Sequence, residues 1–355
     1  MKKVILTTGG TGGHIYPALA VAHELKERGI ETLFVGTSTR MEKNLVPEEG
    51  YRFIGIDIYP PRTLKNIFKF MKGIVQGIKI VKKENPDAII GFGNYISVPV
   101  LLAGIILRKP IYLQEQNANL GMTNKVFYKF AKKTFLAFDK TFDEMPLKYQ
   151  HLFMVTGNPL RDGIYTMSYQ SEREKLKLQD DEKLLLITGG SLGAKDINEG
   201  VIKNWEKIYE KKKIRIYWAT GEKNYEEIWP RLEKMKITDT VKPYFNNMIQ
   251  IMTAADLVVC RAGALTLSEI IELEKPSILI PYNSIKVGQY ENAKILEERN
   301  AALIYPTSDA SSGVEKALEL IENKEELLKI KVKIKALKKG KAAETIVKNL
   351  DIWRN

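Results

Sequence analysis

The fold is decided by residues 7–25, which read TTGGTGGHIYPALAVAHEL. An apolar run ends in the first glycine loop, GGTGG at 9–13, and a helical pattern follows it. A second glycine loop, GGSLG at 189–193, lies 180 residues further on and also follows an apolar run. Because a glycine turn between strand and helix opens the first crossover of a doubly wound domain, two such turns predict two similar domains.

Short β-rich runs alternate with helical patterns along the chain. The predicted strands are 4–8, 32–36, 53–57, 88–91, 110–114, 134–138 and 154–156, then 184–188, 214–220, 241–244, 257–260, 277–281 and 302–305. Continuous apolar strands separated by helices predict parallel sheets covered on both faces. We therefore expect an α/β protein with two doubly wound, Rossmann-like domains, 1–162 and 163–340, which face a ligand cleft at the carboxyl ends of their strands.

Composition limits the partners and the compartment. The net charge of +12 over 355 residues favours anionic partners. A single cysteine, Cys260, allows no intrachain disulfide and fits a reducing compartment. Residues 88–107 carry no charge and are about long enough to span a bilayer. Because Gly91, Gly93, Asn94 and Pro99 interrupt them, we expect a buried strand, a turn and a helix there instead.

Three loops could hold an anionic ligand. Neither glycine loop matches the Walker or dinucleotide pattern, so a plain turn remains an alternative for each. A glycine turn before a helix nevertheless directs backbone N–H groups and the helix dipole at an anion. The third loop, LVVCRAGALTLSEI at 257–270, places Thr266, Ser268 and Glu269 in the first turns of a predicted helix. Glu269 could bind a ribose diol, or it could simply complement the helix dipole.

Sugar contacts and metal sites give weaker signals. Gln289 and Asn292 in GQYENA lie near a predicted helix start, where they could meet a sugar hydroxyl. His14, His23 and His151 are the only histidines, and they form no cluster with metal-ligand spacing. No Asp-x-Asp sequence occurs. We therefore expect no metal site.

Seven segments together resemble one family, the peptidoglycan N-acetylglucosaminyltransferases that make lipid II. The segments are TGGTGGHIYPALAVAHEL, GFGNYISVP, QEQNANLGMTNK, GNPLR, GGSLGAKDIN, VVCRAGALTLSE and GQYENA, in this order. The resemblance implies an inverting transferase of the B-type glycosyltransferase fold, without a cofactor. It also implies UDP-N-acetylglucosamine as donor and lipid I, an undecaprenyl diphosphate muramyl-pentapeptide, as acceptor. The C-terminal helix at 341–355 would pack back on the first domain.

The resemblance also implies site residues. The donor site would comprise Thr11, Gly12, Gly13, Asn117, Arg161, Ser191, Phe245, Ala264, Leu265, Thr266, Leu267, Ser268, Glu269 and Gln289. Ser191 would contact the diphosphate, Phe245 would read uracil through its main chain, and Gln289 would hold sugar hydroxyls. Tyr95 and Asn124 would serve the acceptor. Gly288, Gln114 and Leu192 depart from the family pattern, where glutamine, histidine and glutamine are common.

Transfer to a sugar hydroxyl requires a base near the acceptor. His14, directly after the first glycine loop, is the preferred catalytic base, and Glu115 is the rival. The alternative is that His14 only caps or orients the loop. With His14 as the base, the first loop would serve the acceptor and the transferred sugar, and the second loop would serve the donor diphosphate.

Residues 62–83, RTLKNIFKFMKGIVQGIKIVKK, resemble a membrane-surface helix. Apolar residues at helical spacing are Ile67, Phe68, Phe70, Met71, Ile74, Val75, Ile78 and Val81, and the basic ones are Arg62, Lys65, Lys69, Lys72, Lys79, Lys82 and Lys83. We expect Lys65, Phe68, Lys69 and Lys72 to meet an anionic membrane, which makes the protein peripheral on the cytoplasmic face. The alternative is an ordinary surface helix packed on the sheet.

Three other functions remain open. The same fold serves soluble UDP-N-acetylglucosamine 2-epimerases, which need no lipid, and glycolipid synthases with other acceptors. A nucleic-acid binder is suggested by the charge alone, and no nucleic-acid motif supports it, so we expect no nucleic-acid partner.

Overall fold

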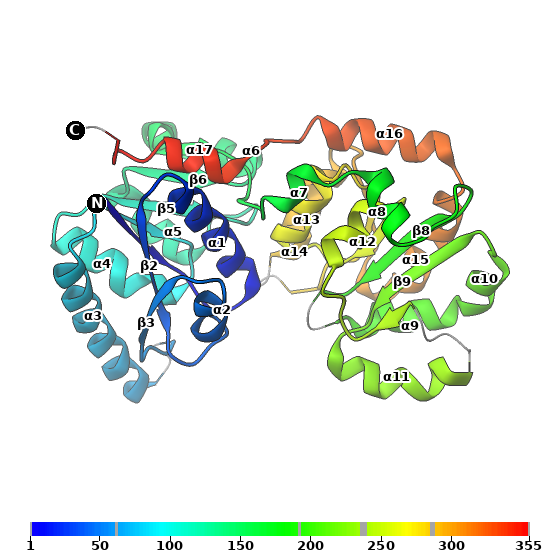
Figure 1. Ribbon diagram of the computed structural model, residues 1–355, viewed down its shortest axis with the longest axis horizontal. Helices are drawn as coiled ribbons and strands as arrows, with labels where there is room; N and C mark the ends of the chain where they lie inside the picture. Colours follow the sequence, from blue (N-terminus) through cyan, green and yellow to red (C-terminus); the bar gives the residue numbers. More distant parts are fainter. Residues whose placement is uncertain (1, 61–62, 191–192, 235–239, 285–287, 354–355) are drawn as a thin grey trace. The chain divides into compact units, whose positions relative to one another are not determined.

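The computed structural model describes residues 2–60, 63–190, 193–234, 240–284 and 288–353 (Figure 1). The chain divides into two compact units. Unit 1 comprises Met1–Asp162 together with Lys339–Asn355, and unit 2 comprises Gly163–Lys338.

Unit 1 is built on a seven-stranded parallel sheet in the order β3-β2-β1-β4-β5-β6-β7. The strands are β1 (Lys3–Thr7), β2 (Glu31–Thr37), β3 (Arg52–Ile56), β4 (Ala88–Gly91), β5 (Ile111–Glu115), β6 (Lys133–Leu136) and β7 (Phe153–Val155). Strand order reverses between β1 and β4, which pair from Val4 with Ala88 to Thr7 with Gly91. In doubly wound sheets, ligands bind at the carboxyl ends of the strands beside this reversal.

Helices cover both faces of this sheet. They are α1 (Gly12–Glu27), α2 (Glu42–Glu48), α3 (Leu64–Glu84), α4 (Val98–Ile106), α5 (Met122–Phe127), α6 (Asp139–Asp143) and α17 (Ala342–Lys348), with 3-10 turns η1 (Tyr95–Ser97), η2 (Tyr128–Phe130) and η3 (Leu147–Leu152). One core joins α1, α17 and the sheet, and the other joins α3, α4 and the opposite face. Fully buried Val21 and Leu25 illustrate the first core, and each such side chain contributes about 1.5–3 kcal/mol.

Unit 2 repeats the pattern with six parallel strands in the order β10-β9-β8-β11-β12-β13. The strands are β8 (Lys183–Thr188), β9 (Ile214–Ala219), β10 (Val241–Lys242), β11 (Leu257–Cys260), β12 (Ser277–Leu279) and β13 (Leu303–Ile304). The helices are α7 (Gly163–Thr166), α8 (Tyr169–Lys175), α9 (Lys195–Lys203), α10 (Trp205–Glu210), α11 (Glu222–Lys234), α12 (Met248–Ala254), α13 (Ala264–Glu272), α14 (Gln289–Glu297), α15 (Ala310–Leu320) and α16 (Lys324–Lys335), with one 3-10 turn, η4 (Thr307–Asp309). Here the order reverses between β8 and β11.

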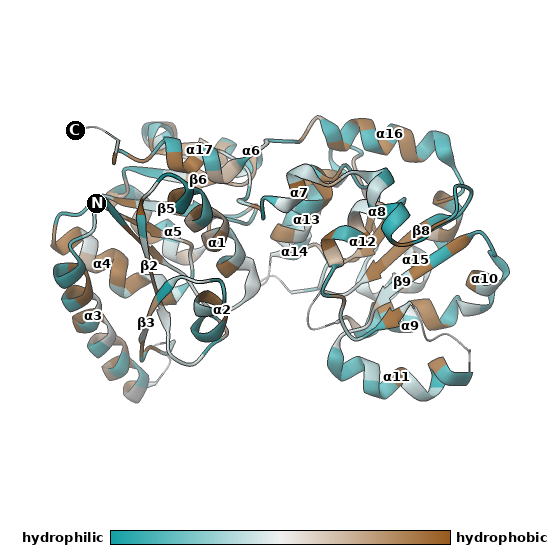
Figure 2. Cartoon of the chain, viewed as in Figure 1, coloured by the Kyte–Doolittle hydropathy of each residue, from teal (hydrophilic) through white to brown (hydrophobic). Residues whose placement is uncertain are grey.

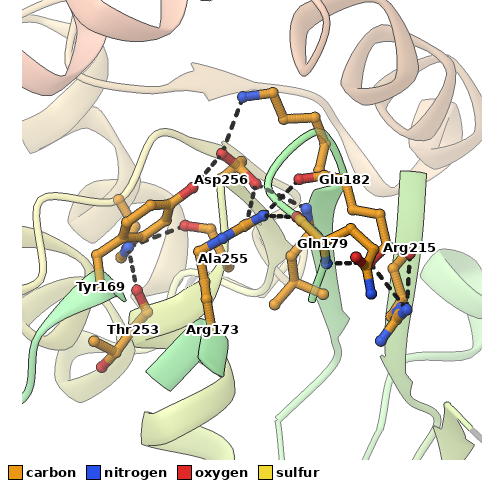
Figure 3. Close-up of polar contacts among 11 residues, drawn as sticks. Tyr169, Arg173, Gln179, Glu182, Arg215, Thr253, Ala255 and Asp256 are labelled. Atoms are coloured by element: carbon orange, nitrogen blue, oxygen red, sulfur yellow. Dashed lines mark hydrogen bonds and ion pairs between the residues drawn. The ribbon is translucent and has the colours of Figure 1, made fainter. Parts of the chain in front are cut away.

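A polar cluster closes the amino edge of this second sheet, opposite the carboxyl ends (Figure 3). Asp256 precedes β11 and accepts hydrogen bonds from the backbone N–H of Leu184 at 2.8 Å and the hydroxyl of Tyr169 at 2.8 Å. The Arg173 guanidinium forms an ion pair with Asp256 at 3.1 Å and donates to the carbonyl of Gln179 at 3.0 Å. The cluster therefore ties α8 to the start of β8 and β11.

The predicted fold class is confirmed: both sheets are parallel and doubly wound. The uncharged segment at 88–107 forms β4, η1 and α4, as expected. The predicted strands 241–244 and 302–305 shorten to two residues each, and these are the two edge strands of the second sheet. Among the described residues, no helix is both long enough and apolar enough to cross a membrane.

Candidate active site

The first glycine loop turns directly from β1 into α1. Gly10 has φ +98°, a conformation that L side chains rarely adopt. Thr11 is extended and caps α1, and its carbonyl accepts hydrogen bonds from the backbone N–H groups of His14 at 3.1 Å and Ile15 at 3.3 Å. Gly12 and Gly13 form the first turn of the helix, with Gly13 and Thr11 exposed. The loop thus presents main chain at the carboxyl edge of the sheet.

Two side chains form hydrogen bonds with the backbone of this loop, and neither contact was predicted from the sequence. Glu42, fully buried in the first turn of α2, accepts hydrogen bonds from Gly10 N at 3.0 Å and Thr37 N at 2.9 Å. Asn94 donates its amide to the carbonyl of Gly9. No spacing signal in the sequence connects these residues, because each lies on a different crossover.

His14 has its two ring nitrogens in different surroundings. Its Nδ1 lies 2.8 Å from the carbonyl oxygen of Phe92 and 3.0 Å from Oε1 of Gln116. Because a backbone carbonyl can only accept, Nδ1 carries the hydrogen and Nε2 keeps its lone pair. The imidazole is partly exposed, so this lone pair suits proton removal from a ligand hydroxyl.

Glu115, the rival base, is occupied by its own loop. Its Oε1 accepts from the backbone and side-chain nitrogens of Asn117 at 3.1 and 3.2 Å. Its Oε2 accepts from Gly121 N at 2.7 Å and Asn124 Nδ2 at 2.8 Å. With four donors on a carboxylate that is 2% exposed, the geometry gives Glu115 a structural role in place of a catalytic one.

The remaining predicted residues of unit 1 are dispersed around this edge. Asn117 and Asn124 bind Glu115, and Asn124 is fully buried, which argues against direct acceptor contact. Tyr95 begins η1 and packs against the core on the α3 side. Arg161 is exposed, with its guanidinium 3.9 Å from the centre of the Tyr16 ring in α1.

The second glycine loop follows β8 in unit 2. A Cβ on Gly189 would lie 2.2 Å from the nitrogen of Ala194, and one on Gly193 would lie 2.1 Å from the carbonyl of Thr220. Both positions therefore require glycine. Ser191 and Leu192 lie outside the described residues.

Helix α13 starts at the carboxyl end of β11, beside the strand reversal of unit 2. Gly263 is extended and precedes Ala264, so the positive end of the helix dipole lies at this edge. Leu265, Thr266 and Glu269 are partly exposed. Leu267 is fully buried, and the hydroxyl of Ser268 donates to the carbonyl of Ala264 at 3.0 Å. These two residues could reach a ligand only through main chain.

The other residues predicted to contact the donor sugar nucleotide differ in burial and in hydrogen-bond partners. The ring of Phe245 is 4% exposed beside Tyr217, which suits a main-chain role. Gln289 accepts from the backbone N–H of Tyr282 at 2.8 Å through its Oε1. Asn292 is 1% exposed and donates to the carbonyl of Ala262, so the expectation that it meets a sugar hydroxyl is wrong.

The basic stretch forms α3 from residue 64 on, and hydrophobic and hydrophilic residues are mixed along this helix (Figure 2). Its apolar residues divide between a buried face and an exposed face. The buried face includes Phe70, Ile78 and Val81 in the core with α4. The exposed apolar residues, which we call the α3 stripe, are Leu64, Ile67, Phe68, Met71 and Val75, with exposures of 44–77%. Lys72 is exposed, whereas Lys69 pairs with Asp57 at 3.4 Å. The Lys65 side chain lies outside the described residues. Phe68 is thus exposed, whereas Phe70 packs on the core.

Within the described part of the chain, no group of three or more histidine, cysteine or acidic side chains could hold a metal ion.

Two family models match the chain. The model described as "Glycosyltransferase family 28 N-terminal domain" matches residues 4–136, and "Glycosyltransferase family 28 C-terminal domain" matches residues 184–349. A curated relative from Fusobacterium nucleatum is 61% identical over 100% of this chain and 99% of its own. One from Halothermothrix orenii is 35% identical over 97% of each chain. Both carry the name UDP-N-acetylglucosamine–N-acetylmuramyl-(pentapeptide) pyrophosphoryl-undecaprenol N-acetylglucosamine transferase.

Two solved structures are also similar to this chain. Acinetobacter baumannii MurG superposes with a TM-score of 0.77 at 28% identity, covering 98% of both chains. A UDP-GlcNAc 2-epimerase from Neisseria meningitidis, bound to UDP-GlcNAc, gives a TM-score of 0.69 at 16% identity over 98% of both chains. The second likeness is one of fold.

Proposed function

The chain belongs to glycosyltransferase family 28, and from this we propose that it transfers N-acetylglucosamine from UDP-N-acetylglucosamine to lipid I. The acceptor is the 4-hydroxyl of the muramyl sugar, and the product is lipid II, a precursor of peptidoglycan. The observation that carries the proposal is the full-length likeness to the relative from Fusobacterium nucleatum. The strand reversals supply a candidate ligand edge in each unit.

In the proposed reaction, His14 is the general base. The acceptor hydroxyl loses its proton to Nε2 of His14 while its oxygen forms a bond to the anomeric carbon of the donor sugar. The bond from that carbon to the diphosphate breaks on the opposite face, so the configuration inverts and UDP leaves with the electron pair. The hydrogen bonds from Nδ1 support this assignment because they leave Nε2 as the acceptor.

The leaving diphosphate gains negative charge during transfer. We place it at the start of α13, with Ser191 of the second glycine loop as a further donor, because a helix N-terminus stabilises an anion. Glu269, one turn inside α13 and partly exposed, would accept hydrogen bonds from the ribose. Thr11, Gly12 and Gly13 would contact the transferred sugar and the acceptor. Arg161 and Gln289 would complete the donor site.

The lipid acceptor requires a membrane surface. The α3 stripe, with Lys72 beside it, supports peripheral docking on an anionic bilayer at its cytoplasmic face. The buried face of α3 packs on the rest of unit 1, as expected for an ordinary surface helix. The exposed face is the one that we propose to dock on the membrane.

The test is UDP release from UDP-N-acetylglucosamine with and without a lipid I analogue in detergent. Release that requires the acceptor and yields a disaccharide lipid supports the proposal. Release without acceptor would contradict it and indicate an epimerase or hydrolase. The H14Q variant should lose about 10²–10⁴-fold in kcat, whereas H23Q, at an exposed histidine of the same helix, should not.

A further inference from the structure

A chain of four side chains lies behind the candidate base. We call it the amide relay, and its members are His14, Gln116, Gln114 and Asn158. His14 comes from α1, Gln114 lies near the end of β5, Gln116 directly follows that strand, and Asn158 follows β7. The three amides are 0–3% exposed, so none of them can touch a bound substrate.

The direction of the relay is set first at Asn158. Its Nδ2 donates to the backbone carbonyl of Gln116 at 3.0 Å. A carbonyl oxygen can only accept, so the amide nitrogen must face it. The Oδ1 of Asn158 is thereby directed at Gln114, whose Nε2 lies 2.9 Å away.

The orientations of the two glutamine amides follow from the same argument. Nε2 of Gln114 donates both to Asn158 and to the backbone carbonyl of Glu115 at 3.1 Å, which leaves its Oε1 for Gln116. Nε2 of Gln116 donates to that Oε1 at 2.5 Å and to the backbone carbonyl of Phe92 at 3.1 Å. Three backbone carbonyls thus direct Oε1 of Gln116 at Nδ1 of His14.

We propose that the amide relay positions the catalytic base. Gln116 accepts the Nδ1 hydrogen of His14 and holds the ring in the tautomer whose Nε2 has the lone pair. Gln114 and Asn158 act through Gln116 by preventing its amide from turning over. This inference rests on the proposed function for the identity of the reaction, but the tautomer can be measured without it.

The relay is also suited to the charged state of the base. When Nε2 takes the acceptor proton, Nδ1 keeps its hydrogen bonds to Gln116 and to the carbonyl of Phe92. The imidazolium is then stabilised by two oxygen acceptors. Because amides do not titrate near neutral pH, no proton has to move along the relay.

The experiment uses the full-length enzyme labelled with ¹⁵N in its histidine rings. The chain has three histidines, and the H14Q spectrum assigns His14. At a pH where the ring is neutral, we expect a protonated Nδ1 and an unprotonated Nε2. In the Q116M variant, the carbonyl of Phe92 is the acceptor that remains for the Nδ1 hydrogen, so the share of the form protonated at Nε2 should rise above that of the wild type. Its kcat should fall on the order of ten-fold, with the KM for UDP-N-acetylglucosamine changed less than about two-fold.

A second variant and a control separate positioning from general packing. N158L removes the far end of the relay and leaves Gln116 in place, so it should shift the tautomer and kcat in the same direction by less. Q150M changes a glutamine on η3 that donates to the carbonyl of Met145 at 3.3 Å, and it should change neither.

Three results would overturn the inference. The first is a wild-type His14 protonated at Nε2. The second is a fall in kcat in Q116M with the tautomer unchanged, which indicates a structural role. The third is no change of either quantity in both relay variants. A correct tautomer response in a protein that transfers no sugar would support the relay and refute the proposed function.

Discussion

Glu42 holds Gly10 in place: the buried carboxylate on α2 accepts the Gly10 backbone N–H at 3.0 Å. Its other oxygen accepts the backbone N–H of Thr37 at 2.9 Å, at the end of β2. One side chain thus joins the first glycine loop to the neighbouring strand. The position of the loop therefore depends on a fully buried side chain of a different helix.

We expect E42Q to destabilise the protein. The new amide directs a donor at one of the two backbone N–H groups, and an unsatisfied buried group costs about 1–3 kcal/mol. Thermal unfolding should show a lower Tm, and transfer should slow because the loop moves. E48Q, at an exposed position of the same helix, is the control and should match the wild type. Equal Tm values for E42Q and E48Q would refute the bracing role.

The glycines of the first loop should differ in tolerance. A Cβ on Gly9 would lie 2.3 Å from Oε1 of Glu42, whereas one on Gly13 would first meet the Thr11 hydroxyl oxygen at 3.8 Å. G9A should therefore lower the Tm, and G13A should keep or raise it, since alanine favours a helix by about 0.5–1 kcal/mol. Differential scanning calorimetry of both variants measures these Tm values. A G9A variant with the Tm of the wild type would contradict the close contact.

Changing Glu115 should affect stability together with activity. E115Q replaces an acceptor of four hydrogen bonds, so we expect the loop from Asn117 to Asn124 to loosen. Hydrogen exchange should accelerate at Gly121, and the Tm should fall with kcat. A large fall in kcat with unchanged Tm and exchange would instead restore Glu115 as the base. E144Q, at an exposed glutamate of the same unit, is the control.

Lys275 should make the stability of unit 2 depend on pH. Lys275 is 6% exposed, and its ammonium donates to the carbonyls of Thr253 at 2.5 Å and Ala255 at 3.0 Å, at the end of α12. Burial, helped by the nearby charge of Lys331, lowers the pKa of Lys275 to about 7.

The unfolded chain binds this proton up to its ordinary pKa of 10.5, whereas the folded protein releases it near pH 7. Lys275 therefore makes the free energy of unfolding rise with pH between these values, by at most about 1.4 kcal/mol per pH unit. K275M should lack this rise, and K212M, at an exposed lysine, should retain it. Urea unfolding can be followed by tryptophan fluorescence, because Trp205, Trp218 and Trp229 lie in unit 2. Parallel pH profiles for the wild type and K275M would refute the titration.

The α3 stripe should bind anionic vesicles. Phe68 is 75% exposed, and burying its ring in a bilayer contributes about 1.5–3 kcal/mol, so F68S should weaken vesicle binding by about ten-fold or more. Sedimentation with vesicles that contain phosphatidylglycerol measures this. L328S removes a side chain on α16 that is 60% exposed and should bind as the wild type does. If both variants lose binding equally, the stripe is not the docking surface.

The fold was predictable because it depends on local patterns. Apolar runs of strand length, glycine turns and helical periodicity recur in both halves, and each requires only a few neighbouring residues. The same patterns predicted where His14 lies, at the start of a helix that follows a glycine turn and a strand. Asn292 was placed wrongly because spacing near a helix start does not say which side of the helix faces the core.

By itself, the sequence determined two doubly wound parallel sheets, the glycine loops at their strand ends and the family. Only the tertiary structure decided which side chains form hydrogen bonds with the first glycine loop and with His14. Glu42 reaches Gly10 across 32 positions of the chain, and Gln116 reaches His14 across 102. It also decided that Glu115 is saturated with donors and that α3 has two apolar faces. Hydrogen bonds between residues far apart in sequence have no period to detect, because crossover packing alone brings their partners together.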